Sequence, residues 1–189
     1  MASRSPFRWT FRRNRTELRP PRKQKMLQIL VVNLLLSTLI FFLAYQWLLR
    51  PQLHWLTPKQ VLVPLLLLHT LRHLGLMFLM PGAIQPGMPI VFALPAAAGD
   101  FISAALALLT LVLIQRRSKF AVPLAWIFTV VGTLDFAMAI TLTRITGSAQ
   151  FLGAAYWIPS FWVPMLLVAH WIIFVVLLRC KRDKIAITD

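Results

Sequence analysis

Five long apolar runs restrict what this chain of 189 residues can fold into more than any other feature. A helix needs about 20 consecutive apolar residues to cross the hydrocarbon core of a bilayer. Runs of that length, with at most one charged residue each, extend over Met26–Leu49, Gln60–Met80, Pro89–Ile114, Ala121–Leu142 and Trp157–Leu178. The chain is 59% hydrophobic and 13% charged, whereas soluble domains carry about 25% charged residues. The sequence therefore excludes a soluble globular fold and predicts an integral membrane protein.

Short connections between the runs indicate one bundle of antiparallel neighbours. The predicted fold class is all-α integral membrane, a bundle of four or five transmembrane helices with short loops. We divide the chain into a basic tail over residues 1–25, a first apolar span over 26–49, a core four-helix unit over 60–178 and a basic C-terminal tail over 179–189. The four-helix alternative arises if the first apolar segment does not fully cross.

The net charge of +15 belongs mainly to the chain ends, because nine of the twenty lysines and arginines lie in the first 25 residues. We expect this tail to be disordered and to lie on anionic lipid headgroups. A nucleic-acid partner is not expected, because the basic residues do not form a folded polar surface. An Arg-rich, Ser-containing tail also resembles a mitochondrial transit peptide, so a mitochondrial inner membrane is an alternative location.

Lysine and arginine counts do not fix the orientation of a five-span bundle. The side that carries the N-terminal tail holds ten of these residues, and the opposite side holds nine. The two nearly uncharged loops, 81–89 and 143–156, indicate that their side is external, whereas the basic tail indicates that the same side is cytoplasmic. Which side the tail faces therefore stays open.

Ionisable residues inside the predicted spans are the most informative feature for function. The chain has five acidic residues, and Asp100 and Asp135 lie in the middle of spans. A charge at the bilayer centre costs about 2.5–3.5 kcal/mol unless it is paired or faces a cavity. Counting along each span at 1.5 Å per residue places Arg72, Asp100 and Asp135 at one height, within about 5 Å of the midplane.

Helical spacing predicts which faces of the spans carry these groups. His69, Arg72 and His73 follow i, i+3, i+4 spacing, so we expect all three on one face. Asp100 shares a face with small residues that permit close helix contact, and Asp135 shares a face with Gly132. His170 is expected roughly 4 Å from the midplane on the other side. We therefore predict a ligand-binding or proton-binding cluster of Arg72, Asp100, Asp135, His69, His73 and His170.

One arginine cannot neutralise two carboxylates, and the excess negative charge is removed most cheaply by protonating one aspartate or by charging His69 or His73. Two interpretations follow. In the first, the cluster is a brace that fixes helix register and moves nothing. In the second, it surrounds a midplane cavity that binds a small polar ligand or passes protons, which explains why several costly groups lie at one level.

Other chemistry has weaker support in the sequence. A b-type haem held by His69 or His73 together with His170 is a minor alternative, and otherwise no cofactor is expected. A zinc site from the same histidines is disfavoured, because the only cysteine, Cys180, lies at the membrane boundary. The chain has no Gly-x-Ser-x-Gly turn and no phosphate-binding glycine loop, so an enzyme is not predicted. An intramembrane acid–base pair of Asp100 and Asp135 is the one enzymatic arrangement left open.

Several motifs resemble those of an uncharacterised family of bacterial polytopic inner-membrane proteins. They are Arg72-His73-Leu74-Gly75-Leu76, Pro95-Ala96-Ala97-Ala98-Gly99-Asp100 and Gly132-Thr133-Leu134-Asp135. The resemblance implies a multi-pass protein of the bacterial cell inner membrane and brings no activity with it. From the residues we predict small-molecule or proton-linked transport or sensing. The alternative is a non-catalytic subunit that anchors or stabilises a larger membrane complex; a membrane-protein partner or a homo-oligomer is expected accordingly.

Overall fold

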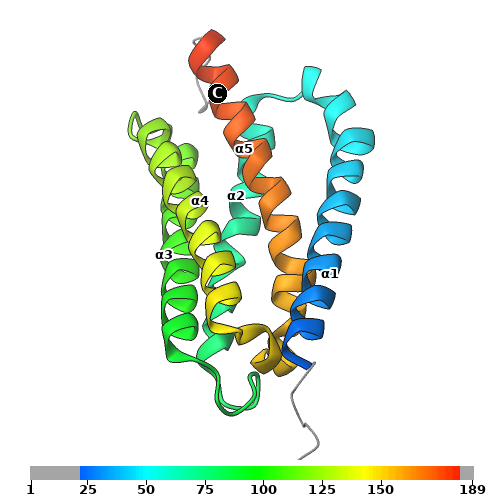
Figure 1. Ribbon diagram of the computed structural model, residues 1–189. Helices are drawn as coiled ribbons and strands as arrows, with labels where there is room; N and C mark the ends of the chain where they lie inside the picture. Colours follow the sequence, from blue (N-terminus) through cyan, green and yellow to red (C-terminus); the bar gives the residue numbers. More distant parts are fainter. Residues whose placement is uncertain (1–21, 184–189) are drawn as a thin grey trace, which may run out of the picture.

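The computed structural model describes residues 22–183, and within that range it contains helices and turns with no β-strand. Five long helices alternate in direction along one bundle (Figure 1). They are α1 (Arg22–Ala44), α2 (Pro58–Thr70), α3 (Ile90–Gln115), α4 (Ala121–Thr146) and α5 (Val163–Asp183). The predicted all-α fold is therefore confirmed, in its five-helix form. The predicted headgroup-binding tail, apart from the residues at the start of α1, lies outside the described residues.

Short segments of other helical geometry extend these helices. A π-helix, η1 (Tyr45–Leu49), and a 3₁₀-helix, η2 (Arg50–His54), continue α1. The 3₁₀-helix η3 (Leu71–Leu79) continues α2 over nine residues. The predicted loop 143–156 is instead largely helical, because α4 runs to Thr146 and the turns η4 (Ser148–Phe151) and η5 (Gly153–Tyr156) follow. The π-helix η6 (Ile158–Trp162) then leads into α5.

Helix α5 lies at the centre of the bundle and packs against α1, α2 and α4 (Figure 1). Helix α3 packs against α4 and against both α2 and η3. The chain enters α1 at one end of the bundle and leaves α5 at the other (Figure 1). The first apolar segment runs beside α5 over most of its length (Figure 1), so it is a full member of the bundle.

Local sequence signals explain where these helices start and stop. Thr57 caps α2 in a capping box with Gln60, which satisfies backbone donors that a helix start leaves free.

The turn 81–89 needs Gly82 and Gly87, because their φ angles of 89° and 92° are ones that L-residues rarely adopt. Backbone hydrogen bonds tie this turn to the α4–α5 connection, from Gln85 N to Phe151 O at 2.8 Å and from Ala155 N to Ala83 O at 2.9 Å.

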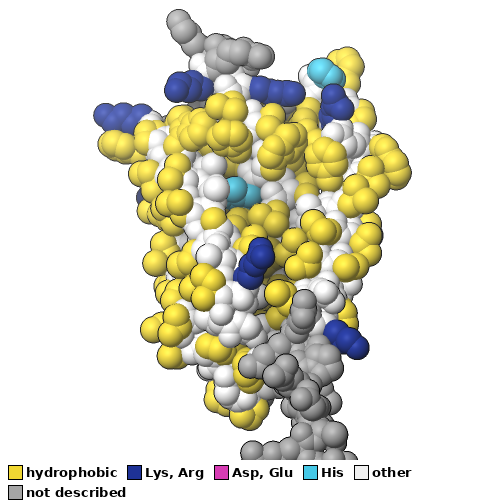
Figure 2. Space-filling model, viewed as in Figure 1, with side chains coloured by type: hydrophobic (Ala, Val, Ile, Leu, Met, Phe, Trp, Pro, Cys, Tyr) yellow, Lys and Arg dark blue, Asp and Glu magenta, His cyan; other side chains and the backbone are white. Residues whose placement is uncertain are grey.

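The outer surface fits a lipid environment. Figure 2 shows hydrophobic side chains over most of the visible height of the bundle; most of the visible Lys and Arg side chains lie near one end, with others midway along the face and toward the opposite end. The first of these ends carries the α1–α2 and α3–α4 connections and the end of α5, with Arg50, Lys59, Arg116, Arg117, Lys119, Arg179 and Lys181. All five helical segments are long and apolar enough to cross a membrane. The architecture therefore fits a membrane protein.

Two separate hydrophobic clusters form the interior. One contains Leu66, Ala107 and Phe128, and the other contains Phe78 and Ala96. On α2–η3, Arg72 falls between Leu66 of the first cluster and Phe78 of the second; on α3, Asp100 falls between Ala96 and Ala107. The bundle therefore has a polar layer between two apolar layers.

Candidate functional site

The buried face of η3 repeats every three residues. A 3₁₀-helix places residues i and i+3 above one another, and the buried residues of η3 are Arg72, Gly75 and Phe78. The prediction that His69, Arg72 and His73 share one face is wrong for His73. His73 is exposed, and its Nδ1 lies 3.0 Å from the carbonyl oxygen of Thr70. The prediction assumed a period of 3.6 residues, which does not apply beyond Thr70.

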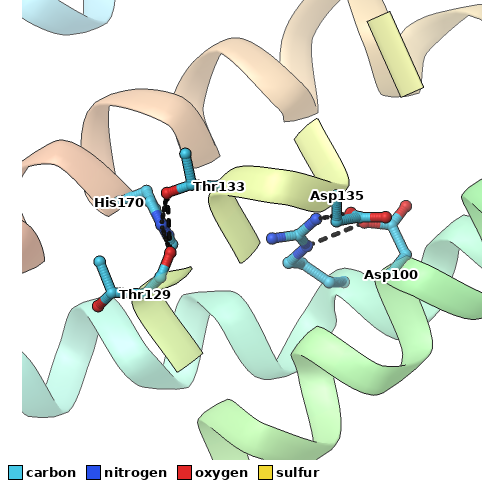
Figure 3. A network of polar contacts seen from close by, with 6 residues as sticks. Asp100, Thr129, Thr133, Asp135 and His170 are labelled. Carbon is cyan, nitrogen blue, oxygen red and sulfur yellow. Dashed lines mark hydrogen bonds and ion pairs between the residues drawn. The ribbon is translucent and has the colours of Figure 1, made fainter. Parts of the chain in front are cut away.

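Arg72 forms ion pairs with both carboxylates, those of Asp100 and Asp135 (Figure 3). Its side chain comes from η3 and is 1% exposed. Nε donates a hydrogen bond of 2.9 Å to Asp100 Oδ1 on α3, and Nη2 donates to Asp135 Oδ2 on α4. The guanidinium also lies over the ring of Phe136, with Cζ 4.1 Å from the centroid, a favourable cation–π geometry. The predicted convergence of Arg72, Asp100 and Asp135 is confirmed.

Glycines on the neighbouring segments make this convergence possible. The carboxylate of Asp100 lies against Gly75 of η3, and that of Asp135 lies against Gly99 of α3; a methyl group on either glycine would overlap the carboxylate. At Gly132 of α4, a methyl group would lie 2.8 Å from His170 Cε1 and 3.2 Å from Arg72 Nη1. Each of these polar side chains can lie where it does because the residue that faces it is a glycine, which has no side chain.

His170 joins the cluster from α5 on the far side of Arg72 (Figure 3). Its Nε2 lies 2.9 Å from the carbonyl oxygen of Thr129 and 3.1 Å from Thr133 Oγ1. A carbonyl oxygen only accepts, so Nε2 carries a proton and donates it. Nδ1 of His170 and Nη1 of Arg72 are both buried without a protein partner, and both lie close to Gly132.

His69 is fully buried, and neither ring nitrogen has a protein partner. Its ring contacts the rings of Phe128 and His170 edge to face, with centroids 5.1 and 5.3 Å away. Two axial haem ligands face each other across a porphyrin, but these two imidazoles are in direct contact and leave no room for a porphyrin between them. His73 is exposed on another face of η3 and cannot replace His69. The arrangement does not fit a haem site.

A cavity of about 380 Å³ reaches the carboxylates, a size within the usual range of small-molecule sites. Asp100 and Asp135 line it together with aromatic side chains from three segments, Phe78, Phe92 and Phe136. Mainly aliphatic side chains of α1 and α4, together with residues of α3, the α4–α5 connection and the start of α5, form the remaining wall. Two of these wall residues, Val31 and Ile140, are 46% and 50% exposed, so the cavity opens between α1 and α4.

Sequence reasoning did not assign roles to Phe136 or to the threonines that hold His170. It identified Gly132 as a small residue beside Asp135 but attached no role to Gly75 or Gly99. A usable signal was present, because Gly75 follows Arg72 by three residues and Gly132 precedes Asp135 by three. A glycine one helical turn from a buried charge indicates that a neighbouring side chain or backbone approaches closely there.

The sequence model of one family, described as Domain of unknown function (DUF8737), matches residues 29–178. This range includes most of α1 and all the residues of the cluster. No curated protein and no solved structure matches the chain.

Proposed function

Since this chain belongs to the DUF8737 family, whose description names no activity, we propose a function from its buried cluster and cavity. The proposed function is proton-linked transport or sensing of a small molecule across a bacterial inner membrane. The molecule binds in the cavity between α1 and α4, and Asp100 and Asp135 are the groups that exchange protons with it or with water.

The observation that carries the proposal is that Asp100 and Asp135 both line the cavity. A brace that only fixes helix register needs a sealed ion pair, because access of water or solute weakens the attraction between buried charges. Here Asp100 and Asp135 line an open cavity, and one arginine serves both of them. Charges inside a membrane are costly and are retained at transport or proton pathways.

Labelling with dicyclohexylcarbodiimide tests the proposal, because this apolar reagent modifies protonated carboxyl groups in apolar surroundings. We expect Asp135 or Asp100 to be modified in the intact, detergent-purified protein, with the site identified by tandem mass spectrometry. The yield should fall as the pH is raised, since only the protonated carboxyl group reacts.

The variants Asp100→Asn and Asp135→Asn serve as controls, because each removes the reactive carboxyl group and nearly preserves its shape. Gel filtration establishes that each variant is folded. Absence of modification at both aspartates in the folded protein would show that the carboxylates are sealed, and the brace interpretation would then replace the proposal. Proton flux into proteoliposomes that contain a pH-sensitive dye separates transport from sensing, because only a transporter produces flux.

A second candidate function is the anchoring subunit, and the exposure of α1 favours it. In the most apolar window of the first helical segment only 6% of residues are buried, against 33–50% in the other four segments. A helix of a partner protein can cover this face as well as lipid can. Purification in mild detergent distinguishes the two candidates, because a stoichiometric partner supports the subunit and a protein without one supports the transporter or sensor.

A further inference from the structure

The charges around the cavity restrict what it can hold. Three formal charges meet at its inner end, the guanidinium of Arg72 and the carboxylates of Asp100 and Asp135. With both carboxylates ionised, one negative charge is in excess. The other charged residue that lines the cavity, Arg144, is exposed at the opposite end of the α4 wall. The inner end of the cavity therefore favours a ligand group with a single positive charge.

Hydrogen bonding at the inner end of the cavity places a second restriction on the ligand. Each carboxylate uses one oxygen for Arg72. The second oxygen of Asp135, Oδ1, is packed against Gly99, whereas the side chain of Asp100, which also lines the cavity, is 15% exposed and bonds to Arg72 through Oδ1 alone. The other oxygen of Asp100, Oδ2, therefore remains as a hydrogen-bond acceptor at the cavity, and a ligand group that donates a hydrogen bond fits there.

The walls define the rest of the ligand. They are formed by aliphatic side chains and by Phe78, Phe92 and Phe136. Aromatic faces attract cations, and aliphatic surface excludes polar groups. From Asp135 to Arg144 the wall follows α4 for about 13 Å at 1.5 Å per residue, a length that an extended chain of about ten carbons spans. Entry between Val31 and Ile140 lies on the apolar flank of the bundle.

We propose that the cavity binds an amphipathic primary ammonium compound, with its ammonium group on Asp135 and Asp100 and its apolar chain along α1 and α4. This inference rests on the proposed function and names the class of molecule that the site takes. The ammonium group supplies both the missing positive charge and an N–H donor to Asp100 Oδ2. The apolar chain of the ligand contacts the cavity wall instead of lipid.

Binding of tritiated decylamine to the purified protein in a scintillation proximity assay tests the ligand class. Unlabelled decylammonium should displace the label, and decanol and decanoate should do so about tenfold less well or worse, since each lacks the charge-assisted hydrogen bond. Decyltrimethylammonium carries the charge without an N–H donor and should also be weaker. Equal displacement by decanol or decanoate would overturn the proposal, and equal displacement by decyltrimethylammonium would overturn the role of Asp100 as acceptor.

Variants locate the site in the cavity. Asp100→Asn should weaken decylamine binding about tenfold. Ala96→Leu fills the cavity and should abolish binding, whereas Ala98→Leu adds the same volume on an exposed position of α3 and should leave binding unchanged. If Ala96→Leu fails to fold, Ala139→Leu fills the cavity from α4 instead. Unchanged binding in a folded, filled variant would place the amine elsewhere and refute the proposal.

The carbodiimide and amine-binding experiments have distinguishable outcomes. Carbodiimide modification of the aspartates without selective amine binding would refute the ligand class and leave the proposed proton-linked function standing. Absence of modification at both aspartates would refute that function together with the ligand class that rests on it.

Discussion

At the scale of single residues, the missing side chain of Gly99 decides whether Asp135 can reach Arg72. The carboxylate of Asp135 occupies the volume that a Cβ atom on Gly99 would need. Gly75 has the same relation to Asp100. Glycine weakens a helix by roughly 0.5–1 kcal/mol relative to alanine, so these glycines lower the intrinsic stability of the helices in exchange for close approach of a charged group.

We expect Gly99→Ala to destabilise the protein by about 1–3 kcal/mol, the usual cost of overpacking, although alanine is the better helix former. The measurement is the free energy of unfolding in mixed detergent micelles. In the background Asp135→Ala the overlapping carboxylate is absent, so the same Gly99→Ala change should cost nothing further. An equal cost in both backgrounds would contradict the close contact between Gly99 and Asp135.

At the scale of elements, η3 sets which side chains face the interior. Its nine residues form an unusually long 3₁₀ segment, since such runs rarely exceed four residues. The period of three buries Arg72, Gly75 and Phe78 and leaves His73 and Leu76 exposed. An α-helix through the same residues would place His73 and Leu76 nearer the face of Arg72. The 3₁₀ geometry thus separates the arginine from one of the two neighbouring histidines.

Nitroxide labels on single cysteines should reveal this period. In a Cys180→Ala background, labels at His73→Cys, Leu76→Cys and Leu79→Cys should be accessible to dissolved oxygen, because these residues are exposed on one face of η3. A label at Phe78→Cys should be protected, because Phe78 is 5% exposed. Protection at both His73→Cys and Leu76→Cys would indicate an α-helix and contradict the 3₁₀ assignment. Power-saturation electron paramagnetic resonance gives the measurement.

At the scale of the whole molecule, the alternating direction of the five helices determines which connections lie at each end of the bundle. The turn 81–89 and the α4–α5 connection meet at one end, joined by backbone hydrogen bonds. The α1–α2 and α3–α4 connections lie at the other end with the end of α5 (Figure 1). A bundle of four crossing helices with a peripheral first segment would place its two termini on the same side. The five-helix arrangement places the two ends of the described chain on opposite sides.

Cysteine accessibility in intact cells should show this arrangement. We expect Gln85→Cys and Gln115→Cys, each in a Cys180→Ala background, to react with an impermeant maleimide from opposite sides of the membrane, because these exposed residues lie at opposite ends of the bundle. A cysteine placed after Asp183 provides the matched control and should react from the same side as Gln115→Cys. Reaction of Gln85→Cys and Gln115→Cys from one side would contradict a bundle that crosses the membrane.

The amino-acid sequence by itself determined the positions of the five apolar runs and the height of the charged groups, and it left open whether the first run joins the bundle. Helix length follows from apolar runs, and height follows from a constant rise per residue. Arg72, Asp100 and Asp135 were therefore predictable as one polar layer, and the contacts confirm their convergence. The chemistry of this layer, one arginine against two carboxylates, was also readable from the sequence.

Only the tertiary structure decided how each helix is rotated and how closely it approaches its neighbours. The exposure of His73, the contact of Asp135 with Gly99 and the cavity beside Asp100 all depend on these two quantities. Neither quantity follows from the periodicity of the sequence. A change from α to 3₁₀ geometry rotates every later side chain about the helix axis, and close approach of two helices depends on glycines in the facing helix. Packing between helices, rather than the pattern along any one of them, therefore decides which polar groups meet.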